Sequence, residues 1–234
     1  ILLYMREIYT STPAMLLLVV GSYFIGTLVY RRVKSSLFHP VVIGLVLVIA
    51  VLMLLHIDYE TFHRGSAFID FLLGPSVVAL GYLLYEQMEH LRGHETAVFF
   101  ATLIGGCIGV TSVILLGYWF GMDEKIISSL QPKSVTIPIA ISLSKHSGGI
   151  PALTTVVVFF CGVLGSIIGP WLLNKCRIKN PIARGLALGS ASHGLGTARA
   201  IELGAIEGAI SGLAIGLTGI VTSLLIPFFE WLMR

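Results

Sequence analysis

The stretch Arg184-Gly-Leu-Ala-Leu-Gly-Ser-Ala-Ser-His-Gly-Leu-Gly-Thr-Ala-Arg199 combines an apolar background with glycines and a row of polar side chains. Gly189, Gly194 and Gly196 each weaken a helix by about 1 kcal/mol relative to alanine. The stretch is also shorter than the run of about 20 apolar residues that an ordinary membrane-spanning helix needs. We therefore predict a discontinuous membrane helix that is broken inside this stretch.

The polar residues around the predicted break suit an anion. A helix that starts again after a break presents free backbone N–H groups and about half a positive charge. An arginine can bind a carboxylate through two parallel hydrogen bonds. The alternative is that the glycines allow close helix packing and that the arginine reaches an interface. The residues expected to bind the anion are Ser190, Ser192, His193, Thr197 and Arg199.

The composition of the whole chain indicates a membrane protein. Of its 234 residues, 56% are hydrophobic and 12% are charged, whereas a soluble domain has about 25% charged residues. The net charge of +3 is too small to indicate binding of nucleic acid. The three cysteines form neither a disulfide framework nor a metal-binding pattern. We expect no metal and no cofactor.

Charge-free stretches divide the chain into ordinary spans and shorter apolar segments. Three of these segments are short and contain glycine or proline: Phe71–Tyr85, Ser134–Ser144 and Gly185–Ala198. Short interrupted segments in corresponding halves of a chain are typical of the binding site of a transporter. The five ordinary spans expected are Ile8–Tyr30, Ser35–Ile57, Thr96–Met122, Ile150–Asn174 and Gly208–Phe229.

The two halves of the chain match at a shift of 115 residues. Leu73-Gly74 and Leu80-Gly81 align with Leu188-Gly189 and Leu195-Gly196, and the boundaries of the apolar segments agree at the same shift. Chance can produce a few leucine-glycine matches, but agreement of the boundaries favours an internal duplication. The predicted repeats of this single transmembrane domain are about 8–122 and 123–234.

The positive charges predict the orientation of these repeats. Basic residues prefer the cytoplasmic side of a membrane protein. Arg31–Lys34 and Lys175–Arg184 share that side only if Lys133–Gly148 is a re-entrant hairpin and not a full span. We therefore predict an all-helical polytopic membrane protein with two inverted repeats, paired broken helices and one re-entrant segment.

Two further segments complete the predicted anion site. Lys133, Ser134 and Thr136 lie between two prolines, and at a re-entrant tip they would donate to an anion. The alternative is an interfacial turn with the lysine among the lipid headgroups. Gly74, Pro75 and Ser76 should open the broken helix of the first half and contribute mainly backbone groups.

Catalysis is not indicated. His193 is close to two serines in sequence, but there is no Gly-x-Ser-x-Gly motif and no clear acidic partner. Serine hydrolase sites are identified by the geometry of their three groups and not by sequence proximity. We expect this protein not to be an enzyme.

Several motifs of the chain resemble the LrgB/CidB family of membrane proteins. They are Tyr59-Glu-Thr-Phe-His-Arg-Gly65, Phe71-Leu-Leu-Gly-Pro-Ser-Val-Val-Ala-Leu80, Pro132-Lys-Ser-Val-Thr-Ile-Pro-Ile-Ala140, Gly148-Gly-Ile-Pro-Ala-Leu-Thr154, Arg184-Gly-Leu-Ala-Leu-Gly189 and Ala191-Ser-His-Gly-Leu-Gly-Thr-Ala-Arg-Ala200. Members of the family often have alanine or isoleucine where this chain has Gly194 and Leu195. The family includes antiholin-like regulators of murein hydrolases and the plastid glycolate/glycerate transporter.

The resemblance implies a multi-pass protein of the bacterial cytoplasmic membrane that acts beside a small LrgA/CidA-type holin-like protein. It also implies either of two functions. One is transport of small monocarboxylates such as pyruvate, lactate or glycolate. The other is modulation of murein hydrolase activity and autolysis without transport. Whether the chain forms a homo-oligomer stays open at this point.

Overall fold

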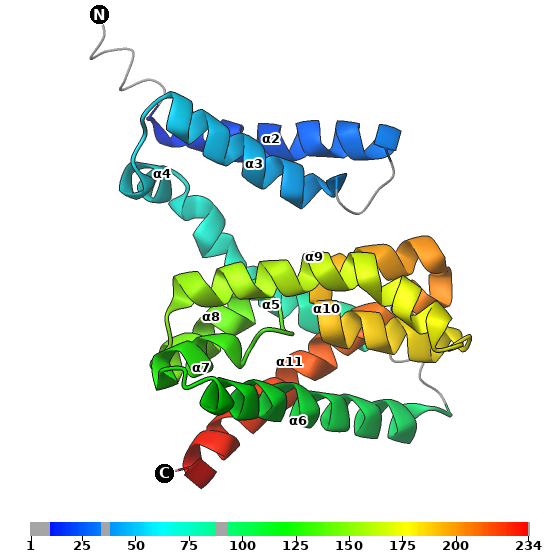
Figure 1. Cartoon of the computed structure of the whole chain (residues 1–234). Helices are drawn as coiled ribbons and strands as arrows, with labels where there is room; N and C mark the ends of the chain where they lie inside the picture. Colours follow the sequence, from blue (N-terminus) through cyan, green and yellow to red (C-terminus); the bar gives the residue numbers. More distant parts are fainter. Residues whose placement is uncertain (1–9, 34–37, 88–92, 234) are drawn as a thin grey trace, which may run out of the picture. The chain divides into compact units, whose positions relative to one another are not determined.

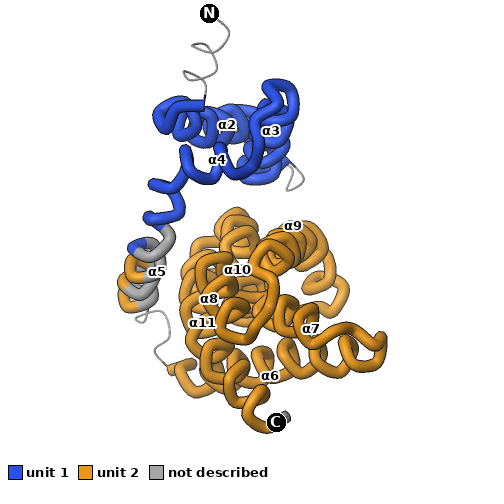
Figure 2. Tube along the Cα trace, turned by 90° about the vertical axis from the view of Figure 1, so that its left-hand side faces the viewer, with its two compact units in different colours: residues 1–76 blue, residues 77–234 orange. Residues whose placement is uncertain are grey.

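The computed structural model describes residues 10–33, 38–87 and 93–233, which fall into two compact units, residues 1–76 and 77–234 (Figure 2). Every regular element in these ranges is a helix.

The first unit contains α2 (Thr12–Val33), α3 (Pro40–Leu54), α4 (Tyr59–Gly65) and the first part of α5 (Ala67–Gln87). Glycine allows α2 and α3 to approach closely, because a Cβ on Gly26 would lie 2.6 Å from the carbonyl oxygen of Pro40. A Cβ on Gly65 of α4 would lie 2.5 Å from Cγ of the buried Met15. The small residues therefore hold α3 and α4 against α2.

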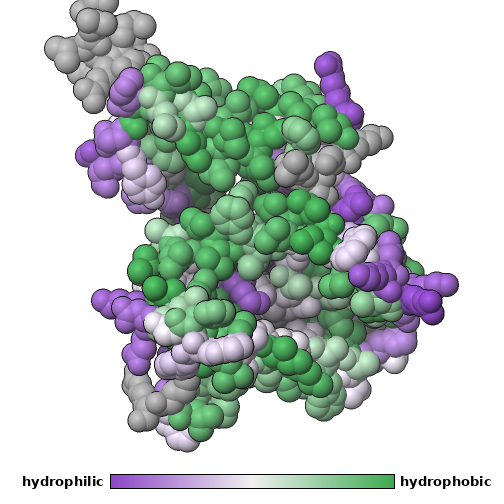
Figure 3. Space-filling model, viewed as in Figure 1, coloured by the Kyte–Doolittle hydropathy of each residue, from purple (hydrophilic) through white to green (hydrophobic). Residues whose placement is uncertain are grey.

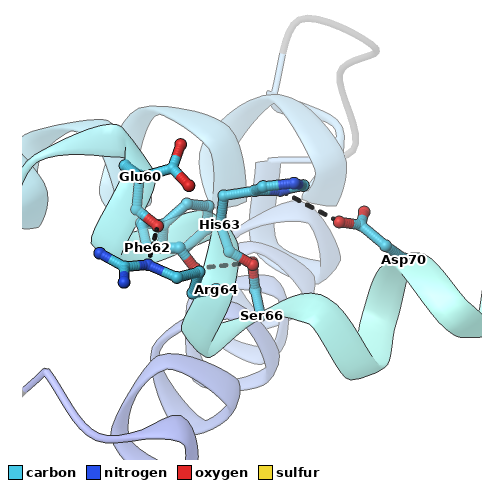
Figure 4. A network of polar contacts seen from close by, with 6 residues as sticks. All are labelled: Glu60, Phe62, His63, Arg64, Ser66 and Asp70. Carbon is cyan, nitrogen blue, oxygen red and sulfur yellow. Dashed lines mark hydrogen bonds and ion pairs between the residues drawn. The ribbon is translucent and has the colours of Figure 1, made fainter.

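Polar contacts connect α4 to α5 (Figure 4). Nδ1 of His63 lies 3.2 Å from a carboxylate oxygen of Asp70. The hydroxyl of Ser66 donates to the carbonyl oxygen of Phe62 at 2.9 Å, and Nε of Arg64 donates to that of Glu60 at 3.4 Å. These contacts fix the turn at which the chain leaves α4.

Asp58 caps the start of α4. Its carboxylate accepts hydrogen bonds from the backbone N–H and the hydroxyl of Thr61, both at 2.9 Å. The two bonds favour the ionised carboxyl, so they lower the pKa of Asp58 below its ordinary value. The cap satisfies one of the N–H groups that a helix start leaves without an intrahelical acceptor.

The second unit is built from the end of α5 and six further helices. They are α6 (Glu95–Trp119), α7 (Glu124–Leu130), α8 (Ile137–His146), α9 (Pro151–Lys175), α10 (Pro181–Leu203) and α11 (Ala205–Met233). The helices α10 and α11 lie between α9 and α6 (Figure 1). Leu188 of α10 and Ile210 and Leu213 of α11 are almost fully buried. The core of this unit therefore forms around α10 and α11.

Within the described residues, four helices are long and apolar enough to cross a membrane: α2, α6, α9 and α11. Their flanks carry large exposed hydrophobic side chains such as Leu17, Ile108 and Phe160. Figure 3 shows hydrophobic side chains along these flanks and hydrophilic ones near the helix ends. Exposing such apolar flanks to water is unfavourable, whereas contact with the acyl chains of lipid is not. The architecture is that of a polytopic membrane protein.

The helix in the second predicted span is shorter than expected. Pro40 starts α3, His39 caps it, and the helix ends at Leu54, just before His56 with its positive φ of 51°. Its 15 residues extend about 22 Å, less than the hydrocarbon core of about 30 Å. The full span predicted over 35–57 is thus a short apolar helix, and residues 35–37 lie outside the described ranges.

The break predicted in the stretch 184–199 is present, whereas the one predicted in the first half is not found. In α10, His193 has φ 40° and ψ −130°, so two helical pieces meet there at a kink. In contrast, α5 runs as one helix from Ala67 to Gln87 with Pro75 inside it. An apolar environment obliges the backbone to satisfy its own hydrogen bonds, which favours a continuous helix. One proline is not enough to end α5.

The predicted re-entrant segment, Lys133–Gly148, contains the short helix α8, and the short helix α7 precedes it. The chain turns at residues 131–136 between α7 and α8. With 10 residues, α8 extends about 15 Å, half the thickness of the hydrocarbon core. The lengths suit a hairpin, and its re-entrant placement in the membrane remains a prediction.

Candidate functional site

A cavity of about 430 Å³ lies in the second unit and is open on one side, where the exposed Ile108 and Ala191 form part of its rim. Its walls come from α6, from the turn between α7 and α8, from α10 and from α11. Three of the residues predicted from sequence meet here, namely Lys133, Ser134 and Ser190. The described lining residues are Gly105, Gly106, Ile108, Gly109, Val110, Ser112, Gln131, Lys133, Ser134, Ala187, Ser190, Ala191, Thr218 and Thr222.

Lys133 is the only charged residue among the described side chains that line this cavity. Its ammonium group donates to the hydroxyl of Ser134 at 3.2 Å. The other polar side chains of the described lining carry hydroxyls and one amide, and none of these described side chains is a carboxylate. A cation surrounded by neutral donors inside a membrane protein attracts a small anion.

Two polar atoms of the lining have no hydrogen-bond partner. They are Oε1 of Gln131 and Oγ1 of Thr218, both of which are buried. A buried polar group without a partner costs about 1–3 kcal/mol, so an occupant that hydrogen-bonds to it gains affinity. The cavity therefore offers hydrogen-bonding groups to a polar ligand.

A cluster of hydroxyls positions the turn that carries Lys133. Ser129 of α7, Ser144 of α8 and Thr154 of α9 are all fully buried. The hydroxyl of Thr154 donates to that of Ser144 at 2.7 Å, and the N–H of Ile150 donates to the hydroxyl of Ser129 at 2.7 Å. These bonds join the end of α7 and the end of α8 to the start of α9, so both helices that flank the turn are held against α9.

Ser192 and His193 pack against α9 and do not line the cavity. The buried ring of His193 has Nε2 2.9 Å from the carbonyl oxygen of Val158, and because a carbonyl only accepts, Nε2 carries the proton. Cβ atoms on Gly162 and Gly165 would collide with His193 and Ser192, respectively. At these α9 positions the glycines serve close helix packing, and His193 connects α10 to α9.

The remaining predicted residues of the second unit also lie outside the cavity lining. The hydroxyl of Thr197 is 2.8 Å from that of Ser211, which joins α10 to α11. The guanidinium of Arg199 is paired with the carboxylate of Glu202, and both side chains are 34% exposed. Thr136 precedes α8, with its buried hydroxyl oxygen unpartnered.

Gly74, Pro75 and Ser76 belong to α5 in the first unit. Of these three, only the side chain of Pro75 is among the described ones, and it is exposed. The predicted contribution of this segment to an anion site remains a prediction.

Sequence reasoning missed several residues of the lining, although two periodic signals mark them. Thr218 and Thr222 are four residues apart in an apolar helix, so they share one face of α11. Gly105, Gly109 and Ser112 follow one another at four and three residues in α6, so they also share one face. Small and hydroxyl residues at helical spacing in an apolar span are the signal that could have found them.

Comparison with known proteins places this chain among LrgB-like membrane proteins. The model of the LrgB-like family matches residues 19–232. The uncharacterized protein YxaC of Bacillus subtilis is 37% identical over 93% of this chain and 94% of its own. The antiholin-like proteins LrgB of Bacillus mycoides and Bacillus cereus are 35% identical, over 89% of this chain and 91% of theirs.

No solved structure matches the chain significantly. The family match covers both units, and the apolar helices agree with it. The chain belongs to the LrgB-like family and is a multi-pass protein of the cell membrane.

Proposed function

We propose that this protein transports small organic monocarboxylates, such as pyruvate, lactate or glycolate, across the membrane. The observation that carries the proposal is the cavity, in which Lys133 is the only charge among the described lining side chains. Its volume of about 430 Å³ falls within the range of about 300–1,000 Å³ that is usual for small-molecule sites. A monocarboxylate fits it in size and in charge.

The lining suggests how the carboxylate is held. The ammonium of Lys133 offers a charge-assisted hydrogen bond, and the unpartnered hydroxyl of Thr218 offers a neutral one. The hydroxyl of Ser190 donates to the carbonyl oxygen of Leu186 at 2.6 Å, so it binds a carboxylate only if it turns away from that carbonyl. A lysine contributes a compact point charge on a flexible stem, so it does not impose one planar geometry. Such a site accepts carboxylates of different shape, and it releases them more readily than a buried arginine would.

The proposal includes a small LrgA/CidA-type holin-like membrane protein as the partner. This part rests on the family resemblance. The exposed apolar flanks of α2, α6 and α9 offer surface for lipid and for a second membrane protein alike. The experiment on transport below therefore also tests whether the partner is required.

The second candidate function is modulation of murein hydrolases and autolysis without transport. The names of the relatives favour it, because those from Bacillus mycoides and Bacillus cereus are called antiholin-like. A pure modulator does not need a polar cavity inside its helices. The two candidates therefore differ in what the residues of the cavity must do.

Uptake of labelled pyruvate, lactate and glycolate into proteoliposomes tests the proposal, with and without the partner protein. We expect saturable uptake by the wild-type chain, and its loss in Lys133→Ala. Lys145→Ala is the matched control, because Lys145 is exposed on α8 and is not part of the lining. Absence of uptake under both conditions, combined with a normal effect on autolysis in cells, would favour the modulator.

A further inference from the structure

A second, polar pocket of about 200 Å³ lies next to the cavity in the same unit. Tyr118, Glu124 and His146 line it and are exposed, so the pocket opens at the surface of the protein. We call it the vestibule. Its described lining residues are Tyr118, Glu124, Ile127, Ser128, Gln131, His146, Ser147 and Glu230.

Gln131 lines both the vestibule and the cavity. No other described residue appears in both linings. The two spaces are therefore neighbours, and the side chain of Gln131 is part of the wall between them.

The side chain of Gln131 is held in place by packing more than by hydrogen bonds. Only 3% of the residue is exposed, and Oε1 has no hydrogen-bond partner. Its backbone is fixed, because its N–H donates to the carbonyl oxygen of Ile127 at 3.0 Å and Pro132 follows it. The amide can thus change rotamer without breaking a bond at Oε1, while the backbone stays where it is.

The charges on the two sides of Gln131 differ in sign. The cavity contains Lys133, whereas the vestibule contains the carboxyl groups of Glu124 and Glu230 and the imidazole of His146. An anion is attracted to the first space and repelled from the second whenever the carboxyls are ionised. The anion therefore rests in the cavity, and the vestibule is a passage and not a second anion site.

We propose that the side chain of Gln131 is the gate between the cavity and the vestibule, and that a rotamer change of its amide opens the path for the monocarboxylate. The identity of the gated species rests on the proposed function. The gate itself rests on the shared wall, the burial of the residue and its unpartnered Oε1.

Cysteine modification tests the gate without measuring transport. In full-length protein with Cys107, Cys161 and Cys176 replaced by serine, Ser190→Cys reports access to the cavity. In a second sample, Glu124→Cys shows from which face of the membrane the vestibule is reached. The probe is a small, membrane-impermeant anionic thiosulfonate, added to either face of proteoliposomes.

Gln131→Ala removes the wall and keeps the backbone. We expect it to raise the rate of modification of Ser190→Cys from the vestibule face by about tenfold, which equals a barrier lower by about 1.4 kcal/mol. Gln131→Met fills the same space and should leave the rate low. Ser128→Ala, which enlarges only the vestibule, is the matched control and should change nothing.

An unchanged rate in Gln131→Ala, with rapid modification of Glu124→Cys in the same membranes, would overturn the gate. If Gln131→Ala does not fold, Gln131→Asn replaces it, because it shortens the side chain by one methylene. It should raise the rate of modification of Ser190→Cys by a smaller factor, and an unchanged rate would likewise overturn the gate. Failure of the proposed function is separate, because the wild-type chain would then show no uptake although Gln131 still controlled access.

Discussion

At the scale of single residues, two cations that are equally conspicuous in the sequence have different surroundings in the fold. Lys133 lines a cavity whose other described polar groups are neutral, and its ammonium donates to the hydroxyl of Ser134. Arg199 is paired with Glu202 on the same helix and is partly exposed. A charge that is already neutralised by a neighbour attracts a ligand weakly, so we expect Lys133 to bind an anion better than Arg199 does.

We predict that Lys133→Ala weakens anion uptake by about tenfold to a hundredfold, because a charge-assisted hydrogen bond contributes about 1.5–3 kcal/mol. Arg199→Ala should change uptake by less than about threefold, since a partly exposed ion pair contributes little. The measurement is concentration-dependent uptake by protein that reaches the membrane in equal amounts. If Arg199→Ala lost more uptake than Lys133→Ala, the anion would bind at the break in α10 and not in the cavity.

The sequence predicts part of this site for definite reasons. Lys133, Ser134 and Ser190 stand out as polar residues in short apolar segments, and they do line the cavity. Thr218 and Thr222 do not stand out, because hydroxyls in an apolar helix commonly bond to their own backbone. Ser190 and Ser192 are two residues apart on one helix, and only Ser190 lines the cavity. The sequence does not distinguish them, because the choice depends on how α10 packs against α9.

At the scale of elements, the course of α10 depends on glycines of α9. His193 takes a backbone conformation that is costly for a residue with a side chain. Its ring is held by the carbonyl oxygen of Val158 and lies over Gly162. The glycines in the stretch 184–199 predict that α10 is broken. The glycines that make room for the side chains at the break belong to α9, and the sequence around the break does not reveal them.

We predict that Gly162→Ala destabilises the protein. The new Cβ would lie 2.7 Å from Cε1 of His193 and 2.9 Å from Cδ1 of Leu195, and overpacking a core costs about 1–3 kcal/mol. Gly105→Ala is the matched control, since a Cβ there has no atom within 4 Å and alanine favours a helix. Thermal unfolding in detergent should show a lower Tm for the first variant only; equal Tm values would show that His193 moves freely.

The start of α4 should depend on pH. Its cap uses the ionised carboxyl of Asp58, whose pKa is lowered by the two hydrogen bonds from Thr61. A lowered pKa means that this stabilisation is complete above the ordinary carboxyl pKa of about 3.9 and is lost as pH falls through the lower, folded value. At neutral pH, Asp58→Ala should remove the same stabilisation.

Hydrogen exchange of the backbone amides of Phe62 and Ser66 measures this effect, since both amides bond within this turn. Asp58→Ala should accelerate the exchange at pH 7. Asp123→Ala is the matched control, because Asp123 precedes α7 without a side-chain capping bond, and it should leave exchange in α7 nearly unchanged. Equal acceleration in both helices would contradict a specific role of the Asp58 carboxyl.

At the scale of the whole molecule, the internal duplication remains a prediction, with which the bounds of some helices agree and those of others do not. A shift of 115 residues carries α3 onto residues 155–169, whereas α9 covers Pro151–Lys175. It carries α5 (Ala67–Gln87) onto residues 182–202, and α10 covers Pro181–Leu203. The same shift carries α6 onto residues 210–234, and α11 covers Ala205–Met233. The match in bounds does not extend to conformation, because α10 is kinked at His193 and α5 is one helix. The inverted relation of the two repeats remains a prediction.

Topology tests that prediction. If the repeats are inverted and the α7–α8 hairpin is re-entrant, the basic loops 31–34 and 175–184 lie on the cytoplasmic side and residues 58–64 lie on the other. Single cysteines in each segment, labelled in intact cells with a membrane-impermeant reagent, should report this arrangement. If the two basic loops label from opposite sides, the hairpin crosses the membrane completely.

The hydroxyl cluster at the base of the hairpin has a consequence for how this family can diversify. Ser129 and Ile150 meet through a direct hydrogen bond, so the segment 130–149 leaves the rest of the unit and returns to it at nearly the same point. Val135 of this segment is buried and packs with Ala140 and with Val158 of α9, so these apolar positions belong to the core. Lys133 and Ser134 are only half buried, and if the proposed function holds, they are positions at which the choice of anion can change while the core is kept. Transplanting a relative's 130–149 segment into this chain is the natural way to transfer its substrate preference.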